Sequence, residues 1–297
     1  MKAFSSVGKA KIHQYDLKLI AELSRKASRK LSYLGLPSPW MGDVLEWKPY
    51  LAQVFAVEKE KRYLSHLMDT AYGLGLVNQV AYFWGDIDKI IESQIDEYRQ
   101  STTTIFPVDL INLDYCHGLD YHGFSKLSTL ESLITRQRKS LLAGHLSVSF
   151  PYFLILLTHN LPHREGDPTA KQNYIRFLTR EAKYYEESLK QQIYDVCEWY
   201  LSIDCPPAYQ HKCFVMGKLF EFAQRNGFKA IPGKIIQYSG DKDATMLHYQ
   251  FQITPVSLGS HVPVDNKMSL IDIMNYSVVS SENKDIAPDH PIIGIQG

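Results

Sequence analysis

The sequence lacks an excess of either charge. Lys and Arg together number 32, and Asp and Glu together also number 32, so the formal net charge is zero. A neutral chain creates no whole-protein field that would gather nucleic acid or an anionic membrane surface. Any polyanionic partner must therefore be bound by a local patch of the surface.

Cysteine is scarce and shows no motif. The four residues Cys116, Cys197, Cys205 and Cys213 include no CxxC pair and no metal-ligand spacing. So few cysteines in a chain of 297 residues do not form a disulfide framework. We interpret them as reduced thiols of a cytoplasmic protein.

Long apolar runs are also missing. The longest covers residues 150–158, is interrupted by Pro151, and has about half of the roughly 20 residues that a membrane helix needs. The first 30 residues contain scattered Lys and Arg without the apolar core of a signal peptide. These features predict a buried strand at 150–158, a cytoplasmic location and no membrane partner.

The amino-terminal region has the apolar spacing of a helix. Steps of three and four residues place one apolar stripe on a single helical face, with Lys and Arg between its members. A helical arm over residues 1–34 is predicted from this stripe, which consists of Leu17, Ile20, Leu23, Ala27, Leu31 and Leu34.

Short apolar runs then alternate with helical patterns. This alternation is typical of βαβ units that build a parallel sheet. The predicted strands are 53–57, 80–84, 108–113 and 150–158, and the helices between them are 61–72, 87–98 and 127–142. After a further helix at 212–225, the runs 228–238 and 246–256 predict an antiparallel hairpin. We therefore expect an α/β fold, with a mostly parallel Rossmann-like sheet that is flanked by helices and ends in this hairpin.

The α/β domain is expected to span residues 35–256. Residues 169–203 are charged, rich in Tyr and free of Gly and Pro, which predicts helices outside the sheet. A helical insertion is accordingly placed at about 166–205. The polar region 257–297 is interpreted as a carboxyl-terminal tail on the surface.

Acidic residues follow three of the predicted strands at equal intervals. Asp86 lies 28 positions after Glu58 (86 minus 58), and Asp114 lies 28 after Asp86 (114 minus 86). Since ligands of open α/β sheets bind beyond the carboxyl ends of the strands, we expect the three carboxylates to surround one cleft. Two alternatives stay open: Glu58 as a solvated side chain of its charged loop, and Asp86 as the N-cap of the next helix.

The order of these parts resembles the class I S-adenosylmethionine-dependent methyltransferases over roughly residues 35–256. Segment 35–47 is similar to the first cofactor loop, Val54 to Glu58 looks like the second strand with its ribose-binding acid, and Gly85-Asp86-Ile87-Asp88 looks like the adenine-contacting segment. The resemblance implies S-adenosylmethionine as cofactor. The residues that it assigns to cofactor binding are Gly35, Pro37, Glu58, Asp86 and Ile87.

The segment Asn112-Leu113-Asp114-Tyr115-Cys116 is similar to the fourth-strand motif of that family. In many amino-group methyltransferases this motif holds the target nitrogen beside the methyl group. The resemblance therefore implies that Asp114 and Tyr115 orient the methyl acceptor, without a metal. It leaves open whether the acceptor is nucleic acid or protein.

The segment after the fourth predicted strand allows other chemistry. His117 and His122 with Asp114 could form a metal site or a general base, and Cys116 could be a nucleophile. A polar loop with a small buried cysteine explains the same residues. The tyrosines of the insertion fit either base stacking or packing against the core.

Two further functions compete with a methyltransferase. The irregular first loop and the helical insertion fit a non-catalytic subunit of a larger assembly, and a homo-oligomer is equally compatible. Asp43 close to Glu46-Trp47-Lys48 has the residue types of a metal-dependent nuclease, although the acids lie closer together than in the usual hairpin. Cofactor binding is the property that distinguishes the methyltransferase from these alternatives.

Overall fold

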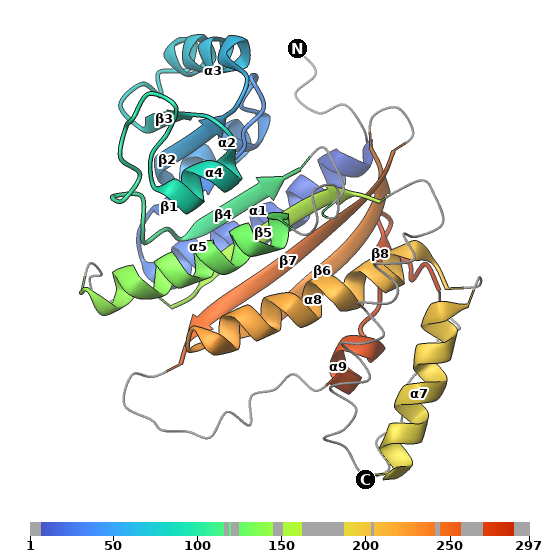
Figure 1. The fold of residues 1–297 in the computed structure, drawn as a ribbon. Coiled ribbons are helices and arrows are strands. Elements are labelled where there is room, and N and C mark those ends of the chain that lie inside the picture. The colour runs from blue at the N-terminus through green and yellow to red at the C-terminus, as the bar shows by residue number, and fades with distance from the viewer. Residues whose placement is uncertain are drawn as a thin grey trace.

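One mixed sheet forms the centre of the computed structural model, which describes residues 7–115, 119, 125–144, 151–161, 187–202, 205–240, 244–256 and 270–287. The described strands occur in the order β3-β2-β1-β4-β5-β7-β6-β8 (Figure 1). Their bounds are β1 Leu31–Gly35, β2 Leu51–Glu58, β3 Val80–Trp84, β4 Leu110–Asp114, β5 Phe153–Asn160, β6 Phe228–Ser239, β7 Thr245–Pro255 and β8 Val279–Ser280.

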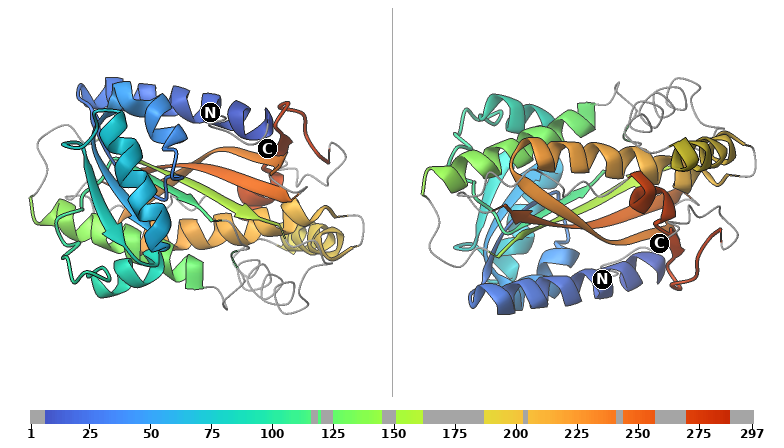
Figure 2. Two further views of the ribbon diagram at one scale, coloured as in Figure 1. Left: turned by 90° about the horizontal axis from the view of Figure 1, so that it is seen from above. Right: turned by 90° about the horizontal axis from the view of Figure 1, so that it is seen from below.

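Helices cover both faces of the sheet. Figure 2 shows α1 on one face, and α5 and α8 on the other, with the strands between them. The described helices are α1 Val7–Ala27, α2 Gly42–Trp47, the short 3-10 helix η1 Lys48–Tyr50, α3 Lys61–Gly73, α4 Ile87–Ser93, α5 Ser125–Leu142, α7 Glu187–Leu201, α8 Pro207–Arg225 and α9 Leu270–Asn275. The layers leave the carboxyl ends of the parallel strands at one edge of the sheet.

The central strands are buried on both faces, as a covered parallel sheet requires. Successive side chains of a strand point to opposite faces. In β5, Leu154 and Leu156 pack in the cluster on the α1 side, while Ile155 and Leu157 pack in the cluster with α5 and α8. The apolar run at 150–158 therefore forms a buried strand, as predicted. The strand begins at Phe153 and ends at Asn160.

The strand directions confirm the predicted fold class. The pairs β1–β2, β1–β4, β2–β3 and β4–β5 are parallel, whereas β7 is antiparallel to both β5 and β6. The sheet is thus mostly parallel and Rossmann-like, with the antiparallel hairpin of β6 and β7 toward one end. The short strand β8, which was not predicted, pairs in parallel with β6 beyond this hairpin.

The predicted helical arm is wrong in its last residues. Helix α1 ends at Ala27, and Leu31–Gly35 is β1, a central strand of the sheet. Ser28 has a φ of 54°, a left-handed conformation that stops the helix. Leu31 and Leu34 fit the helical spacing by coincidence, because Leu31 packs on the α1 side of the sheet and Leu34 on the opposite side.

Two other boundaries differ from the sequence interpretation. Helix α4 ends at Ser93, because Gln94 at its C-cap has a φ of 64°. Part of the presumed surface tail packs in the core, where Met274 and Val278 are fully buried. The buried ammonium of Lys212 donates a 3.0 Å hydrogen bond to the carbonyl oxygen of Met274, which anchors this segment to α8. Of the predicted insertion, α7 is described, and residues 166–186 lie outside the described residues.

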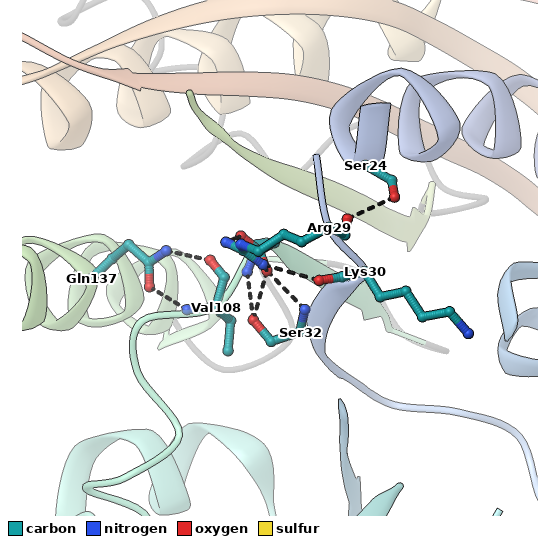
Figure 3. A network of polar contacts seen from close by, with 7 residues as sticks. Ser24, Arg29, Lys30, Ser32, Val108 and Gln137 are labelled. Carbon is teal, nitrogen blue, oxygen red and sulfur yellow. Dashed lines mark hydrogen bonds and ion pairs between the residues drawn. The ribbon is translucent and has the colours of Figure 1, made fainter. Parts of the chain in front are cut away.

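A network of paired polar groups joins β1 to β4 at the amino-terminal ends of these strands (Figure 3). We call this end of the parallel strands the amino edge of the sheet. The carboxylate of Asp109, which is 1% exposed, accepts hydrogen bonds of 2.6 and 2.7 Å from the guanidinium of Arg29. It also accepts from the backbone nitrogen and the hydroxyl of Ser32. Gln137 of α5 hydrogen-bonds both backbone groups of Val108. These groups are paired within the protein, so we interpret this edge as structural.

In the described part of the chain, the helices are too short or too polar to cross a membrane.

Candidate functional site

The strand order reverses between β1 and β4. From β1 the chain adds β2 and β3 on one side, then crosses over and adds β4 and β5 on the other. In open α/β sheets such a switch point is where ligands bind, beyond the carboxyl ends of the strands. Gly35, Glu58, Trp84 and Asp114 are the last residues of β1, β2, β3 and β4. This carboxyl edge is the candidate site.

The loop after β1 rests on a buried polar contact. Asp43 of α2 accepts hydrogen bonds from the Tyr33 hydroxyl at 2.9 Å and from the Asn112 side-chain amide at 3.3 Å. Burial, and then the charge of Asp43, raise the pKa of Tyr33 well above its usual value, so the hydroxyl stays a donor. A Cβ at Gly35 would meet the Tyr33 hydroxyl and, at 2.8 Å, the Asn112 carbonyl oxygen. Glycine is required there for the tyrosine to reach Asp43.

Two of the predicted cofactor residues shape this loop rather than expose side chains. Gly35 and Pro37 are both buried. The loop is tied to α3 by a 2.8 Å hydrogen bond from the Thr70 hydroxyl to the Pro39 carbonyl oxygen. Met41, at the end of the loop, is buried and has a φ of 52°. Ligand contacts of Gly35 and Pro37 would therefore come from their backbone, whereas the side chains of Ser38 and Trp40 in the same loop are exposed.

Glu58 and Asp86 lie at the ends of neighbouring strands. Glu58 pairs in register with Trp84, and its carbonyl oxygen accepts from the Gly85 nitrogen at 3.0 Å. Its carboxylate Oε1 accepts from the Glu60 nitrogen at 2.7 Å. Among the described residues, Oε2 has no hydrogen-bond partner. A half-buried carboxylate with one fixed and one open oxygen is suited to accept from a ligand hydroxyl.

The segment after β3 confirms Asp86 as the N-cap of α4, and its role in ligand binding stays a prediction. The Asp86 carboxylate accepts from the Asp88 nitrogen at 2.9 Å and so caps α4. Gly85 before it has a φ of 139°, which favours glycine and turns the chain at the strand end. Ile87 is 4% exposed and belongs to the core. The Ile87 side chain therefore packs in the core and holds this turn in place.

The two predicted acceptor residues point to opposite faces of the sheet, as adjacent strand positions do. The Asp114 carboxylate faces α1 and is 2.8 Å from the ammonium nitrogen of Lys9. The Tyr115 side chain packs in the cluster with α5, where its hydroxyl donates to Asp88 at 3.2 Å. Burial and the charge of Asp88 raise the pKa of Tyr115 well above its usual value. The structure thus does not bring Asp114 and Tyr115 together.

The sequence interpretation missed a polar cluster beneath α1. Asp114, Thr158 and His248 are register partners across β4, β5 and β7. His248 Nδ1 is 2.8 Å from the Thr158 hydroxyl, and His248 Nε2 is 3.0 Å from Asp16 of α1. Gln250 also donates to Asp16, at 2.7 Å. Since a carboxylate only accepts, Nε2 of the ring carries a proton.

One sequence signal could have indicated this cluster. Lys9, His13 and Asp16 are spaced by four and three residues, so they share one face of α1, and that face is the buried one for His13 and Asp16. The ring of His13 stacks on Trp47 with 5.6 Å between centroids. Burial lowers the pKa of His13 despite the nearby charge of Asp43. A polar stripe on the packed side of a helix is the signature of a polar site below it.

On the other face, the carboxyl end of β5 holds a fully buried histidine. His159 Nδ1 is 3.1 Å from the Asn160 carbonyl oxygen, while Nε2 has no hydrogen-bond partner in the described structure. Its ring stacks on Tyr249 with 5.6 Å between centroids. Burial, followed by the charge of His211, lowers the pKa of His159 to about 3. The imidazole is therefore neutral at ordinary pH.

The residues considered for metal chemistry have other surroundings. Asp43 bonds to Tyr33 and Asn112, and the Lys48 ammonium reaches the Leu74 carbonyl oxygen at 3.3 Å. Within the described ranges, no group of three His, Cys, Asp or Glu side chains is arranged to hold a metal ion. Cys116, His117 and His122 lie outside the described residues. Of the residues that the structure describes, the cysteines 197, 205 and 213 are buried and form no disulfide.

Comparison with solved structures finds proteins with a related chain path. Trm5b from Pyrococcus abyssi has a TM-score of 0.43 at 12% identity, over 84% of this chain and 50% of that chain. The O-methyltransferase from Bacillus cereus, in complex with SAH, has a TM-score of 0.41 at 11% identity, over 85% of this chain and 84% of that one. TYW2 of M. jannaschii, in complex with AdoMet, has a TM-score of 0.40 at 11% identity, over 80% and 76%.

This chain spans half the length of the Trm5b chain that it matches. No family model and no curated protein matches the sequence.

Proposed function

We propose that this protein is an S-adenosylmethionine-dependent methyltransferase whose cofactor lies at the carboxyl edge of β1, β2 and β3. The observation that carries the proposal is the open carboxylate of Glu58 beside the switch point between β1 and β4. A nucleoside presents ribose hydroxyls, and an acidic side chain at the end of the second strand accepts hydrogen bonds from them. The family resemblance of the sequence assigns the same role to this residue.

The hydrogen-bonding groups at the carboxyl edge are of the types that S-adenosylmethionine requires. Glu58 supplies an acceptor for a ribose hydroxyl, and the turn Gly85-Asp86 supplies backbone groups beside it for the adenine. Gly35 and Pro37 hold the backbone of the first loop close to the strand ends. When bound, S-adenosylmethionine supplies an electrophilic methyl group on a sulfonium sulfur. The protein then has to orient the acceptor and receive its proton.

Asp114 is the residue proposed to do this. It ends β4, directly across the switch point from the first loop, and its side chain is 25% exposed. A carboxylate in this place can hold an N–H or O–H of the acceptor and take its proton as transfer proceeds. Tyr115, which bonds to Asp88, would act by fixing the end of β4. The acceptor is a nucleophilic group of a nucleic acid, a protein or a small molecule.

A non-catalytic relative of this fold is the second candidate. The Lys9–Asp114 ion pair favours it, because the carboxylate proposed to meet the acceptor already has a partner within the chain. In that case the protein would serve as a subunit of a larger assembly or as a homo-oligomer. Cofactor binding and transfer separate the two candidates.

The test measures both properties on the same preparation. Binding of S-adenosylmethionine is followed by calorimetry, and transfer of its labelled methyl group is followed into nucleic acid, protein and small-molecule pools. We expect Asp114→Asn to keep cofactor affinity within a few fold and to lower transfer by about a hundredfold. Asp69→Asn, at an exposed position of α3, is the matched control. Binding without any transfer would favour the non-catalytic candidate, and absence of binding would contradict the proposal.

A further inference from the structure

We infer that Lys9 is itself a methyl acceptor. Its ammonium nitrogen is 2.8 Å from Asp114 Oδ2, which is where the proposed function places the acceptor nitrogen. The two side chains are 33% and 25% exposed, so the pair is partly shielded from water and still reachable. This inference rests on the proposed function, since it identifies one acceptor for the same site.

The location of Lys9 is fixed by buried contacts of its own helix. Asp16 lies seven positions further along α1, about two turns away on the same face. Its carboxylate accepts from His248 at 3.0 Å and from Gln250 at 2.7 Å, and Asp16 is 3% exposed. His248 in turn contacts Thr158, the register neighbour of Asp114. The same cluster therefore positions both the helix that carries Lys9 and the strands beside Asp114.

Lys11 provides the contrast within the same helix. It forms an ion pair with Glu282, and the two side chains are 37% and 61% exposed. Glu282 follows β8, at the far end of the sheet from the switch point. An exposed pair of this kind contributes little and marks no site. Lys11 is accordingly a natural internal control for any reaction of Lys9.

Methyl transfer to Lys9 needs only the Asp114 carboxylate as base and the cofactor as methyl donor. One proton of the Lys9 ammonium passes to the Asp114 carboxylate, and the freed electron pair on Nζ forms a bond to the methyl carbon. The bond between that carbon and the sulfonium sulfur breaks, and its electron pair stays on sulfur, which leaves S-adenosylhomocysteine. The new bond makes Nζ a methylammonium, which keeps the positive charge of the lysine, and Asp114 releases the proton that it took to water. The product can therefore pair with Asp114 as before, so the docking of α1 survives the modification.

The first experiment incubates the full chain with S-adenosylmethionine labelled in its methyl group and maps the label by peptide mass spectrometry. We expect label on Lys9 and none on Lys11, at a first-order rate that does not change with protein concentration. Lys9→Arg should remove the label. Asp114→Asn should slow its appearance by about a hundredfold, the scale for loss of a positioned base.

A second readout does not depend on turnover. Acetylation of lysines by acetic anhydride is compared with and without S-adenosylhomocysteine, whose binding is established separately by calorimetry. The bound ligand should protect Lys9 and leave the reactivity of Lys11 unchanged. If the chain binds S-adenosylhomocysteine but Lys9 is neither methylated nor protected, or is protected without being methylated, the inference is overturned and the proposed function stands. If the chain does not bind it, the proposed function fails and the inference with it.

Discussion

The two edges of the parallel sheet use polar side chains in different ways. At the amino edge, Asp109 accepts from Arg29 and Ser32, and each of its oxygens has a partner within the chain. At the carboxyl edge, Glu58 has one oxygen bonded and one open. Asp114 has an ammonium partner in Lys9 but is a quarter exposed.

The pairing of a carboxylate distinguishes a structural role from a binding role better than the presence of its charge does. A buried polar group is costly unless it is paired, so a fully paired carboxylate such as Asp109 is explained by the stability of the fold. A strand-end carboxylate with an open oxygen, such as Glu58, stabilises the fold little and remains available to a ligand. The comparison predicts that the amino edge controls unfolding and the carboxyl edge controls binding.

The largest expected effect comes from breaking the amino edge. Asp109→Ala removes the partner of Arg29 and leaves the Ser32 nitrogen without its acceptor. Because the Arg29 side chain is 34% exposed, water replaces part of the lost pairing, and removal of the Asp109 carboxylate with its hydrogen bonds costs about 2–3 kcal/mol. The free energy of unfolding in urea should fall by this amount. Asp69→Ala, on the exposed surface of α3, should change it by no more than about 0.5 kcal/mol, and equal effects of the two variants would contradict the account.

The next effect tests the buried contacts that support the loop after β1 at the carboxyl edge. Gly35→Ala places a methyl group against the Tyr33 hydroxyl and 2.8 Å from the Asn112 carbonyl oxygen. Overpacking of this kind costs about 1–3 kcal/mol and should also weaken cofactor binding, because the first loop moves with Tyr33. Gly73→Ala, whose Cβ would meet no atom within 4 Å, is the control for denaturation and calorimetry. An unchanged Gly35→Ala variant would show that this contact does not set the loop.

A smaller effect concerns the pH dependence of stability. Burial lowers the pKa of His159 to about 3 in the folded protein, below its ordinary value of 6.5. Between these values the unfolded chain binds a proton that the folded chain does not, so stability falls as the pH is lowered. The slope from this residue rises toward about 1.4 kcal/mol per pH unit as the pH falls below 6.5. His159→Gln should lose that slope between pH 6.5 and pH 5 in urea titrations, whereas His66→Gln on the surface of α3 should keep it.

The smallest effect on stability, and the most specific one, is expected at Glu58. Glu58→Gln should change the free energy of unfolding by less than about 0.5 kcal/mol. A hydrogen bond to a charged group contributes about 1.5–3 kcal/mol, which corresponds to a tenfold to hundredfold loss of cofactor affinity. Calorimetry should detect this loss of cofactor affinity. Glu60→Gln, the exposed carboxylate of the same loop, should bind normally, and equal losses in both variants would remove Glu58 from the ribose role.

Much of the fold could be predicted because its strands are short apolar runs that end in polar residues. Residues 80–84 match β3 exactly, and the equal spacing of Glu58, Asp86 and Asp114 reflects successive units of one sheet. Strand β1 could not be recognised in the same way. Its leucines continue a helical spacing across Ser28, and only the left-handed backbone of Ser28 breaks the helix.

The site was predictable only in part. The strand-end acids follow from local sequence, but the partners that α1 brings depend on contacts between residues far apart in the chain. Lys9 and Asp114 are separated by 105 positions, and Asp16 and His248 by 232. The alternation of side chains along a strand does place Asp114 and Tyr115 on opposite faces. That conclusion was available from the sequence once β4 was assigned.

Hydrogen–deuterium exchange with and without S-adenosylhomocysteine tests the difference between the two edges most directly. A ligand that binds the folded chain slows exchange where it contacts the backbone and stabilises the surrounding structure. We predict additional protection in segments 36–43, 58–60 and 85–88 at the carboxyl edge, and none that exceeds the global change in segments 28–32 and 105–109 at the amino edge. Protection centred on the amino edge, or no protection at saturating ligand, would contradict the assignment of the site.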